Sequence, residues 1–371
     1  MINEKKITFI YNTAIDKYRK TVFDRENHEE SSNPIYTKEG KWQWGDTWSG
    51  GFLIGSLLLL YEYDGSSFWK NKALECCKGL NKYILDDSFQ DIGYIIYFSY
   101  AIGYDITKIS HLKENALKTA ESLFNSLMPG GYLKCSWMSD GEKIQSVDGL
   151  MNNLIWIWAY KQTKDKKYIK AFQKNITISI NNLIKSDGGT YEYVQADPLS
   201  GDLIKPIYKN SESIDSVWTR GHTWAIYGLI KAEICLSSQG YKQYLEEIDK
   251  LSEFFIENCQ NYLPSWDLVA SKKKHLLDTS AAAIAASAFL EYGHHLSINN
   301  DLINGGKYWG YGERILIQLC NNFISYDHLH QGLLLDVSTP FKYINAPNES
   351  AIWGDYFLLE ALSVYRRYSQ Q

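Results

Sequence analysis

The stretch Trp48-Ser-Gly-Gly-Phe-Leu-Ile-Gly-Ser-Leu-Leu-Leu-Leu-Tyr-Glu-Tyr-Asp-Gly65 contains the unit that repeats along this chain. A short polar and aromatic cluster, Trp48 to Phe52, stands before a run that is apolar on nearly all sides, and Asp64-Gly65 ends the run as a turn. The segment 67–84 that follows has an apolar stripe on one side only. This pattern predicts a buried inner helix over 51–63 and a half-exposed outer partner over 67–84.

The same arrangement recurs five more times. The other clusters are Asp91-Ile-Gly-Tyr94, Asp148-Gly-Leu-Met151, Arg220-Gly-His-Thr-Trp224, Asp278-Thr-Ser-Ala281 and Glu349-Ser-Ala-Ile-Trp353. Recurrence at this scale is typical of a repeated supersecondary unit. Because six helical hairpins can close into a ring, we predict an all-α (α/α)6 barrel with the six clusters at one mouth.

Hydrophobic periodicity places the remaining elements. Residues 4–24 suit a first amphipathic helix, whereas 25–47 are expected to be irregular. Inner and outer helices are predicted in pairs at 92–103 and 110–127, 149–163 and 165–185, 222–238 and 241–260, and 279–293 and 307–324, with a last inner helix at 351–368. Gly131–Ser136 is strand-like, and a β-hairpin is predicted near 190–208, with Thr190–Val194 and Leu203–Tyr208 as its strands.

Length and composition limit the possible classes of protein. A chain of 371 residues exceeds the usual size of one core, but no linker divides it, so we predict one catalytic domain over 1–371. The net charge of −5 argues against nucleic acid as a partner. The chain has no run of 18 or more apolar residues, so we predict no membrane span.

The six cysteines lack CxxC spacing, and no apolar segment follows the N-terminal Met-Ile-Asn-Glu-Lys-Lys. These features predict reduced thiols in a cytoplasmic protein. No His or Cys spacing suggests a metal site, and no glycine-rich phosphate loop suggests a nucleotide. We therefore expect no metal and no cofactor.

Aromatic residues make up 15% of the chain, with 12 Trp and 28 Tyr. Most are expected to fill the core. Those that stand before helices beside Gly or Asp are better suited to hold sugar rings, whose faces are apolar and whose edges carry hydroxyl groups. Trp48, Trp224 and Trp353 are therefore predicted to bind substrate.

Two aspartates are candidates for acid–base chemistry. Asp148 and Asp91 each stand at the start of a buried helix, where helix capping is one explanation. Two carboxyl groups at the same level of one barrel would also form an acid/base pair. Asp278 begins Asp-Thr-Ser-Ala, a standard helix start, so capping is favoured there.

Arg220 lies between two tryptophans in Trp218-Thr-Arg-Gly-His-Thr-Trp224. Its guanidinium could receive a carboxylate through two parallel hydrogen bonds, or form a structural salt bridge. Gly221 would let the backbone approach a ligand. His222 could be a hydrogen-bond donor, a base or a buried structural residue.

These ordered motifs, together with Ile352-Trp-Gly-Asp-Tyr-Phe-Leu-Leu-Glu-Ala361, resemble glycoside hydrolase family 88, the unsaturated glucuronyl hydrolases. Family 105, the unsaturated rhamnogalacturonyl hydrolases, is a weaker match. The resemblance implies an (α/α)6 barrel that removes a 4,5-unsaturated uronic acid from the non-reducing end of lyase-derived oligosaccharides. It also implies that Asp148 is the general acid/base, with Asp91 as its partner, and that the C4=C5 vinyl ether is hydrated.

The chain departs from the family pattern at three places. His222 stands where the family usually has Gln, and Phe89-Gln90 replaces a pair that is often His-His. A pocket His before the Asp-Pro turn is replaced by Tyr191 or Glu192. The resemblance therefore implies the reaction more firmly than the substrate, to which Tyr191, Arg220 and His222 are expected to bind.

Two other classes remain open. Sugar 2-epimerases also use (α/α)6 barrels, but they need a pair of proton-transferring His residues, and only His222 is well placed. A non-catalytic sugar-binding protein would keep the aromatic residues, yet the presence of both Asp91 and Asp148 counts against it.

Overall fold

The computed structural model describes residues 1–88, 90–135, 140–237, 244–270, 276–338 and 348–369. The chain divides into two compact units. The terminal unit comprises Met1–Gly79, Cys259–Trp266 and Lys273–Gln371, and the central unit comprises Leu80–Asn258 and Asp267–Lys272. The expected single catalytic domain over 1–371 stays a prediction.

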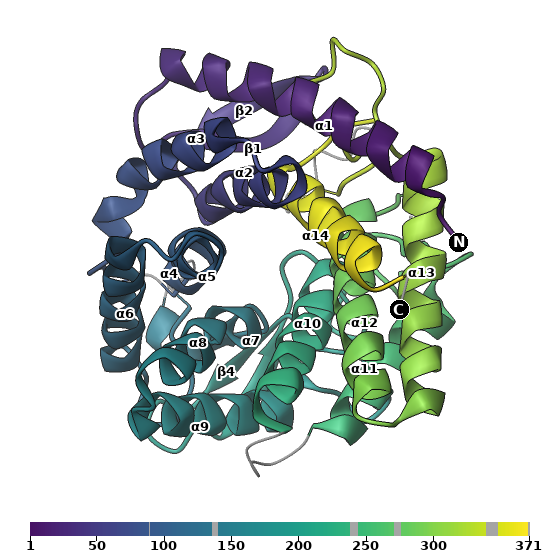
Figure 1. Ribbon diagram of the computed structural model, residues 1–371. Helices are drawn as coiled ribbons and strands as arrows, with labels where there is room; N and C mark the ends of the chain where they lie inside the picture. The colour runs from purple at the N-terminus through teal and green to yellow at the C-terminus, as the bar shows by residue number, and fades with distance from the viewer. Residues whose placement is uncertain (89, 136–139, 238–243, 271–275, 339–347, 370–371) are drawn as a thin grey trace. The chain divides into compact units, whose positions relative to one another are not determined.

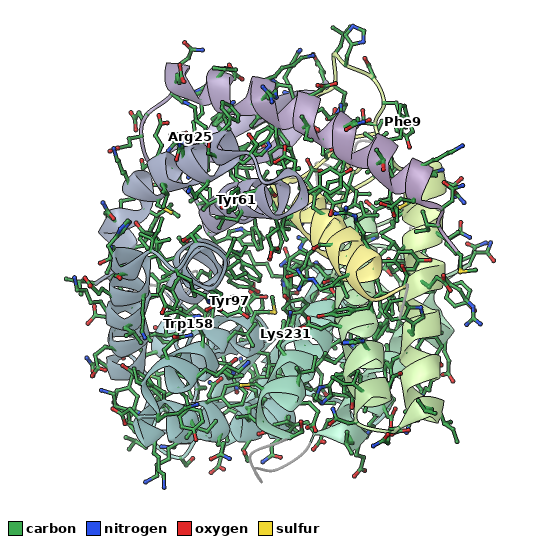
Figure 2. All side chains as sticks on the ribbon, viewed as in Figure 1. Phe9, Arg25, Tyr61, Tyr97, Trp158 and Lys231 are labelled. Carbon is green, nitrogen blue, oxygen red and sulfur yellow. The ribbon has the colours of Figure 1, made fainter. Side chains whose placement is uncertain are left out.

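Helices that are buried on all sides form the core of the terminal unit. Its helices are α1 (Glu4–Asp24), α2 (Gly50–Asp64), α3 (Ser67–Cys77), α12 (Thr279–Ile298), α13 (Leu302–Asn322) and α14 (Ile352–Tyr368) (Figure 1). α12 packs on α13 and α14, and α14 packs on α2. Gly65 ends α2 with a left-handed φ of 71°, as predicted. α1 has the predicted bounds, and Phe9 on its outer face is 57% exposed (Figure 2).

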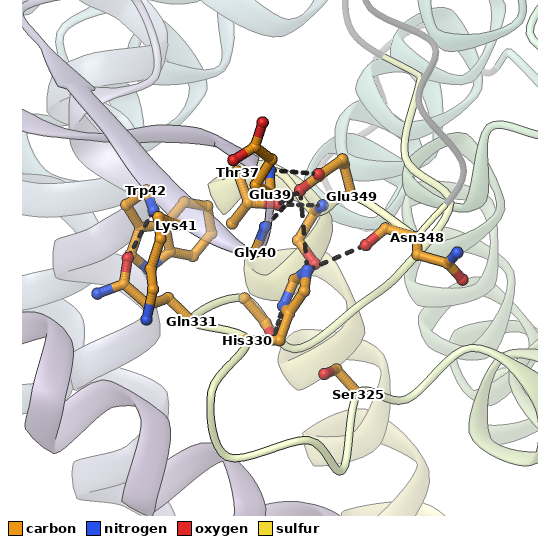
Figure 3. A network of polar contacts seen from close by, with 12 residues as sticks. Thr37, Glu39, Gly40, Lys41, Trp42, Ser325, His330, Gln331, Asn348 and Glu349 are labelled. Carbon is orange, nitrogen blue, oxygen red and sulfur yellow. Dashed lines mark hydrogen bonds and ion pairs between the residues drawn. The ribbon is translucent and has the colours of Figure 1, made fainter.

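A β-hairpin lies where irregular structure was predicted. β1 (Asn33–Lys38) pairs antiparallel with β2 (Lys41–Gly45). The two turn residues, Glu39 and Gly40, have φ of 53° and 71°, which is typical of a type I′ turn. Their backbone N–H groups donate to the carboxylate of Glu349, at 2.6 Å and 3.3 Å (Figure 3). The prediction was wrong because this turn is held by a residue 310 positions away.

The central unit contains shorter and more broken helices. They are α4 (Ile92–Ile96), α5 (Ile102–Thr107), α6 (Ser110–Asn125), α7 (Gly149–Asn152), α8 (Leu154–Thr163), α9 (Lys166–Leu183), α10 (Thr219–Leu236) and α11 (Leu245–Asn258) (Figure 1). Trp158 of α8, labelled in Figure 2, donates to Asp105 of α5 at 3.0 Å. Residues 238 and 241–243 of the predicted pair 222–238 and 241–260 lie outside the described residues.

Two predicted inner helices are interrupted. The helix expected over 92–103 contains a π-helical turn at Tyr97–Ala101, where the Ser99 hydroxyl donates to the carbonyl of Ile95. A side chain that bonds the carbonyl four residues earlier often bends a helix. The helix expected over 149–163 is divided at Asn153 into α7 and α8.

A three-stranded antiparallel sheet leads into one of the candidate residues. β3 (Ile144–Ser146) pairs with β4 (Tyr193–Ala196), which pairs with β5 (Leu203–Ile207). The predicted hairpin near 190–208 is confirmed, whereas β3 was missed. No strand forms over the described part of Gly131–Ser136, residues 131–135; Leu133 makes only an isolated bridge with Leu127. Ser136 lies outside the described residues.

Candidate active site

Asp91 and Asp148 occupy the N-cap positions of α4 and α7, but neither side chain caps its helix. Asp278 behaves differently, because its Oδ1 accepts from the backbone N–H of Ala281 at 3.3 Å. Capping is therefore confirmed for Asp278. For Asp91 and Asp148, the structure directs the carboxyl groups to other partners.

Asn152, which sequence reasoning missed, links the two aspartates. Its Nδ2 donates to Asp91 Oδ1 at 2.9 Å and to the backbone carbonyl of Asp148 at 3.2 Å. Its Oδ1 accepts from the backbone N–H of Tyr94 at 2.9 Å. One buried amide therefore joins the first turn of α4 to α7. The signal was weak, because Asn152 follows Asp148 by one helical turn within an otherwise apolar run.

Gly93 allows this close contact between α4 and α7. A Cβ at position 93 would lie 2.6 Å from Asn152 Cα and 2.7 Å from Asn152 Oδ1. Both distances are well below van der Waals contact, so a side chain would force the two helices apart. The Asp91-Ile-Gly-Tyr94 motif thus combines a carboxylate with the glycine that lets Asn152 reach it.

The environment of Asp148 favours its protonated form. Burial, together with the negative charges of Asp91 and Glu192, raises the pKa of Asp148 from 3.8 to about 8, and Ser146 and Arg220 oppose part of this shift. The Ser146 hydroxyl donates to Oδ2 at 3.1 Å. Oδ1 is buried and has no hydrogen-bond partner among the described residues. Asp148 is therefore suited to donate a proton near neutral pH.

Arg220 brings a positive charge into the environment of Asp148. It lies in the first turn of α10, which begins three residues before the predicted start, and it is 1% exposed. Its guanidinium carbon lies 5.0 Å from the centre of the Trp218 ring. A Cβ at Gly221 would lie 2.5 Å from that ring and 2.8 Å from Val147. The space beside Gly221 is therefore filled by Trp218 and Val147, whereas the sequence predicted that a ligand would approach the backbone there.

Two buried tyrosines complete this cluster. The charges of Asp148 and Asp91 act on the hydroxyl groups of Tyr94 and Tyr193, whose pKa values burial raises well above the usual range. The ring of Trp224 packs edge-on against Tyr94, with centroids 5.5 Å apart. Trp224 is 1% exposed, so it supports Tyr94 from behind.

Both ring nitrogens of His222 lie within hydrogen-bond distance of groups other than the candidate carboxyl groups. It is fully buried on α10, where Nε2 donates to the carbonyl of Leu251 on α11 at 3.0 Å and Nδ1 accepts from the Thr190 hydroxyl at 3.4 Å. This pattern fits the neutral imidazole, and burial lowers the pKa of His222 to about 4. We therefore reinterpret His222 as a structural residue between α10 and α11, in place of the predicted substrate contact.

Replacement of His222 tests this interpretation through acid stability. A lowered histidine pKa contributes stability above pH 6.5, the unfolded value, and loses it as pH falls through about 4. We expect His222→Gln to lower the free energy of unfolding at neutral pH and to flatten its decline between these two pH values. Urea unfolding at several pH values measures both effects. A changed ranking of substrates with unaltered stability would restore the substrate role.

Glu192, and not Tyr191, lies in the electrostatic environment of Asp148. The Glu192 carboxylate accepts backbone N–H groups from Lys209 at 2.8 Å, from Asn210 and from Ser211. Tyr191 is half-buried, with its ring 4.8 Å from Lys185 Nζ. Of the departure at Phe89-Gln90, Phe89 lies outside the described residues.

Gln90 is a buried amide directly before Asp91. It is 2% exposed, and neither Nε2 nor Oε1 has a hydrogen-bond partner among the described residues. A buried amide without a partner is energetically costly. Hydroxyl groups of a saccharide would satisfy both atoms, which makes Gln90 a candidate that the sequence indicated only as a departure from the family pattern.

Trp48 and Trp353 belong to the terminal unit. Their rings are 5.0 Å apart. Trp353 is fully buried and donates from Nε1 to the Ser280 hydroxyl at 3.0 Å. Trp48 is half-buried and is thus the member of this pair with ring surface to offer a ligand. Their contacts with substrate stay predictions.

The described residues also bear on metal binding and on membranes. Among these residues, no group of three or more His, Cys, Asp or Glu side chains is arranged to hold a metal ion. Across the described ranges, no helix has both the length and the apolar character needed to cross a bilayer.

Most glycoside hydrolases use a pair of carboxyl groups that lie in different environments. Residues 14–335 match the family model described as Glycosyl Hydrolase Family 88. The chain belongs to this family and is a glycoside hydrolase, as the sequence motifs predicted.

Individual relatives cover most of the chain. An unsaturated chondroitin disaccharide hydrolase of Streptococcus pneumoniae is 27% identical over 334 residues, 85% of this chain and 81% of the relative. An unsaturated glucuronyl hydrolase of Bacillus sp. (strain GL1) is 25% identical over 366 residues, 92% of this chain and 91% of the relative.

The solved structure of an unsaturated glucuronyl hydrolase specific for heparin matches with a TM-score of 0.89 and 20% identity, over 100% of this chain and 99% of that one. At this identity the match shows the fold. The predicted (α/α)6 barrel is therefore confirmed.

Proposed function

We propose that this family 88 enzyme removes a 4,5-unsaturated uronic acid from the non-reducing end of oligosaccharides that polysaccharide lyases release. Asp148 acts as general acid and then as general base, and Asp91 is its charged partner. The observation that carries the proposal is the linked pair itself. Asn152 donates to the Asp91 carboxylate, whereas burial beside that charge keeps Asp148 protonated, with a pKa of about 8.

In the first step, the carboxyl group of Asp148 protonates C4 of the unsaturated sugar. The electron pair of the C4=C5 double bond forms the new C–H bond, and C5 becomes an oxocarbenium-like cation. The negative charges of Asp91 and Glu192 surround Asp148 and stabilise this developing positive charge.

In the second step, the Asp148 carboxylate accepts a proton from water while the water oxygen bonds to C5. The product is a hemiketal. The C5 hydroxyl of the hemiketal then loses its proton and becomes a ketone as the bond between C5 and the ring oxygen breaks, and the ring oxygen takes up a proton to become a hydroxyl group on C1. The hemiacetal that remains at C1 then releases the rest of the saccharide, so no enzyme nucleophile is needed at the anomeric carbon.

Arg220 and Gln90 are proposed to bind the sugar. An arginine guanidinium matches the uronate carboxylate through two parallel hydrogen bonds, and the Gln90 amide can donate to one hydroxyl and accept from another. Trp224 is proposed to act behind these contacts, because it is buried against Tyr94. In the terminal unit, Trp48 is proposed to offer its ring face to a sugar, and Trp353 is proposed to support that ring.

The proposal is tested by absorbance of the conjugated double bond. Loss of this absorbance is expected on at least one member of a panel of unsaturated disaccharides derived from chondroitin, heparin and hyaluronan. The matched control is the saturated disaccharide with the same linkage, which should not be cleaved because it has no vinyl ether to protonate.

Equal cleavage of saturated and unsaturated disaccharides would instead indicate ordinary glycoside hydrolysis. Retained absorbance together with a changed sugar stereochemistry would favour the epimerase reaction. The relatives differ in their named substrates, chondroitin disaccharide in one and heparin in another, so the panel also ranks the substrates of this chain.

A cytoplasmic location is proposed as well. All six cysteines are thiols, and five of them are buried. Buried thiols that form no disulfide are usual in a reducing compartment. Such a location suits an enzyme that degrades small fragments of polysaccharides after their uptake.

A further inference from the structure

Asn152 and Asn153 are adjacent, fully buried asparagines with different partners. Both are 0% exposed. Asn152 bonds the Asp91 carboxylate, the Asp148 carbonyl and the Tyr94 N–H, as described above. Asn153 Nδ2 donates to Asn175 Oδ1 on α9 at 2.9 Å. The pair therefore offers a natural comparison between an amide at the carboxyl groups and one that faces an outer helix.

The amide of Asn152 has only one orientation that satisfies its contacts. Its Oδ1 must accept from the Tyr94 N–H, so its Nδ2 must point to Asp91 Oδ1 and the Asp148 carbonyl. An ionised carboxylate is a stronger hydrogen-bond acceptor than a protonated carboxyl group. A donor that is fixed beside Asp91 therefore favours the ionised form of Asp91. Backbone atoms on two helices thus determine where this donor lies.

Several charged or titratable groups face the pair from neighbouring elements. Arg220 comes from α10 and Tyr94 from α4, while Tyr193 begins β4 and Glu192 directly precedes it. Arg220 is the cation among the groups that act on Asp148, and its charge opposes part of the rise that burial causes in the pKa of Tyr94. The Asn152 amide, which is neutral, donates a hydrogen bond to Asp91.

We propose that Asn152 is a positioning residue that keeps Asp91 ionised and aligned, so that the proton of the pair resides on Asp148. This inference rests on the proposed function, in which Asp148 is the acid and Asp91 its charged partner. Asn152 acts through Asp91 and does not touch the reacting atoms. Its contribution should therefore appear in the pH dependence of turnover.

The test compares Asn152→Ala with Asn153→Ala on the best unsaturated disaccharide of the panel. Removal of the Asn152 donor should move the acid limb of the kcat/KM profile to higher pH by about one unit, since a hydrogen bond to a charged group of this kind accounts for a shift of that size. It should also lower kcat more than it raises KM. Asn153→Ala should leave the acid limb in place while it lowers stability.

Asn152→Ser serves as a second variant with a smaller loss of polarity, and it should shift the acid limb in the same direction. Unchanged acid limbs in the folded Asn152 variants would overturn the inference, as would an equal shift in Asn153→Ala. Failure of the proposed function is distinguishable, because Asp148→Asn would then remain active whatever the Asn152 variants do.

Discussion

Asp148→Asn should abolish nearly all hydrolysis of unsaturated disaccharides while the protein still folds. The amide is nearly isosteric with the carboxyl group but cannot transfer a proton, so we expect a loss of about 10²–10⁴-fold or more in kcat. Loss of double-bond absorbance measures the rate. The matched control is Asp278→Ala, which removes a true helix cap and should lower the free energy of unfolding by about 0.5–2 kcal/mol.

The stability of the Asp148→Asn variant gives an independent readout. An acid whose pKa is raised from 3.8 to about 8 stabilises the folded state below its unfolded value, and this contribution is lost as pH rises through about 8. As pH rises from 3.8 to about 8, the free energy of unfolding of the variant should therefore fall less than that of the wild type. Wild-type turnover should fall on the alkaline side of the same pKa, because the general acid is then ionised.

Two results would count against this role of Asp148. Activity within tenfold of wild type would remove it from the acid/base step. A large fall in melting temperature at neutral pH would instead indicate that Asp148 stabilises α7, although its side chain makes no capping hydrogen bond.

Gly93→Ala should strongly lower the stability of the protein. The new Cβ would lie 2.6 Å from Asn152 Cα and 2.7 Å from its Oδ1, and much of this clash is with backbone that cannot rotate away. We expect the free energy of unfolding to fall by about 3 kcal/mol or more. Activity should fall as well, because separating α4 from α7 breaks the link between Asn152 and Asp91.

Gly149→Ala is the matched control, since Gly149 also follows a candidate aspartate in a short buried helix. A Cβ there would meet nothing within 4 Å, so stability should be unchanged or rise by up to about 1 kcal/mol through helix propensity. Urea unfolding of both variants provides the comparison. Equal effects of the two substitutions would show that the contact between α4 and α7 is not specifically tight.

Much of the helical framework was predictable because it depends on local hydrophobic periodicity. α1 has the predicted bounds, and helices such as α2 and α12 are buried along their length where the sequence is apolar on all sides. The hairpin of β4 and β5 was also predictable from its turn residues. The pattern that predicts each of these elements is local in the sequence, so it can be recognised without knowing the tertiary structure.

The interruptions of the inner helices were not predictable in this way. The π-helical turn at Tyr97–Ala101 and the division at Asn153 occur within runs that remain apolar throughout. β3 has three residues and exists because β4 offers it a partner. Pairing and packing across long separations decide such features, and a local pattern carries little information about them.

For the candidate site, the sequence by itself determined which residue types stand at the helix starts. It placed Asp91, Asp148 and Asp278 before apolar runs, with capping favoured only for Asp278, and it placed Arg220 and His222 close together. Only the tertiary structure decided what each side chain contacts. Asp278 bonds its own helix, Asp91 bonds Asn152, and His222 faces Leu251 on α11. The physical reason is that all three aspartates precede an apolar run in the sequence, whereas the partner of each side chain depends on the backbone conformation that packing imposes. Asp278 has φ of −124° and ψ of 86° and caps its helix, while Asp148 has the helical angles −61° and −21° and does not.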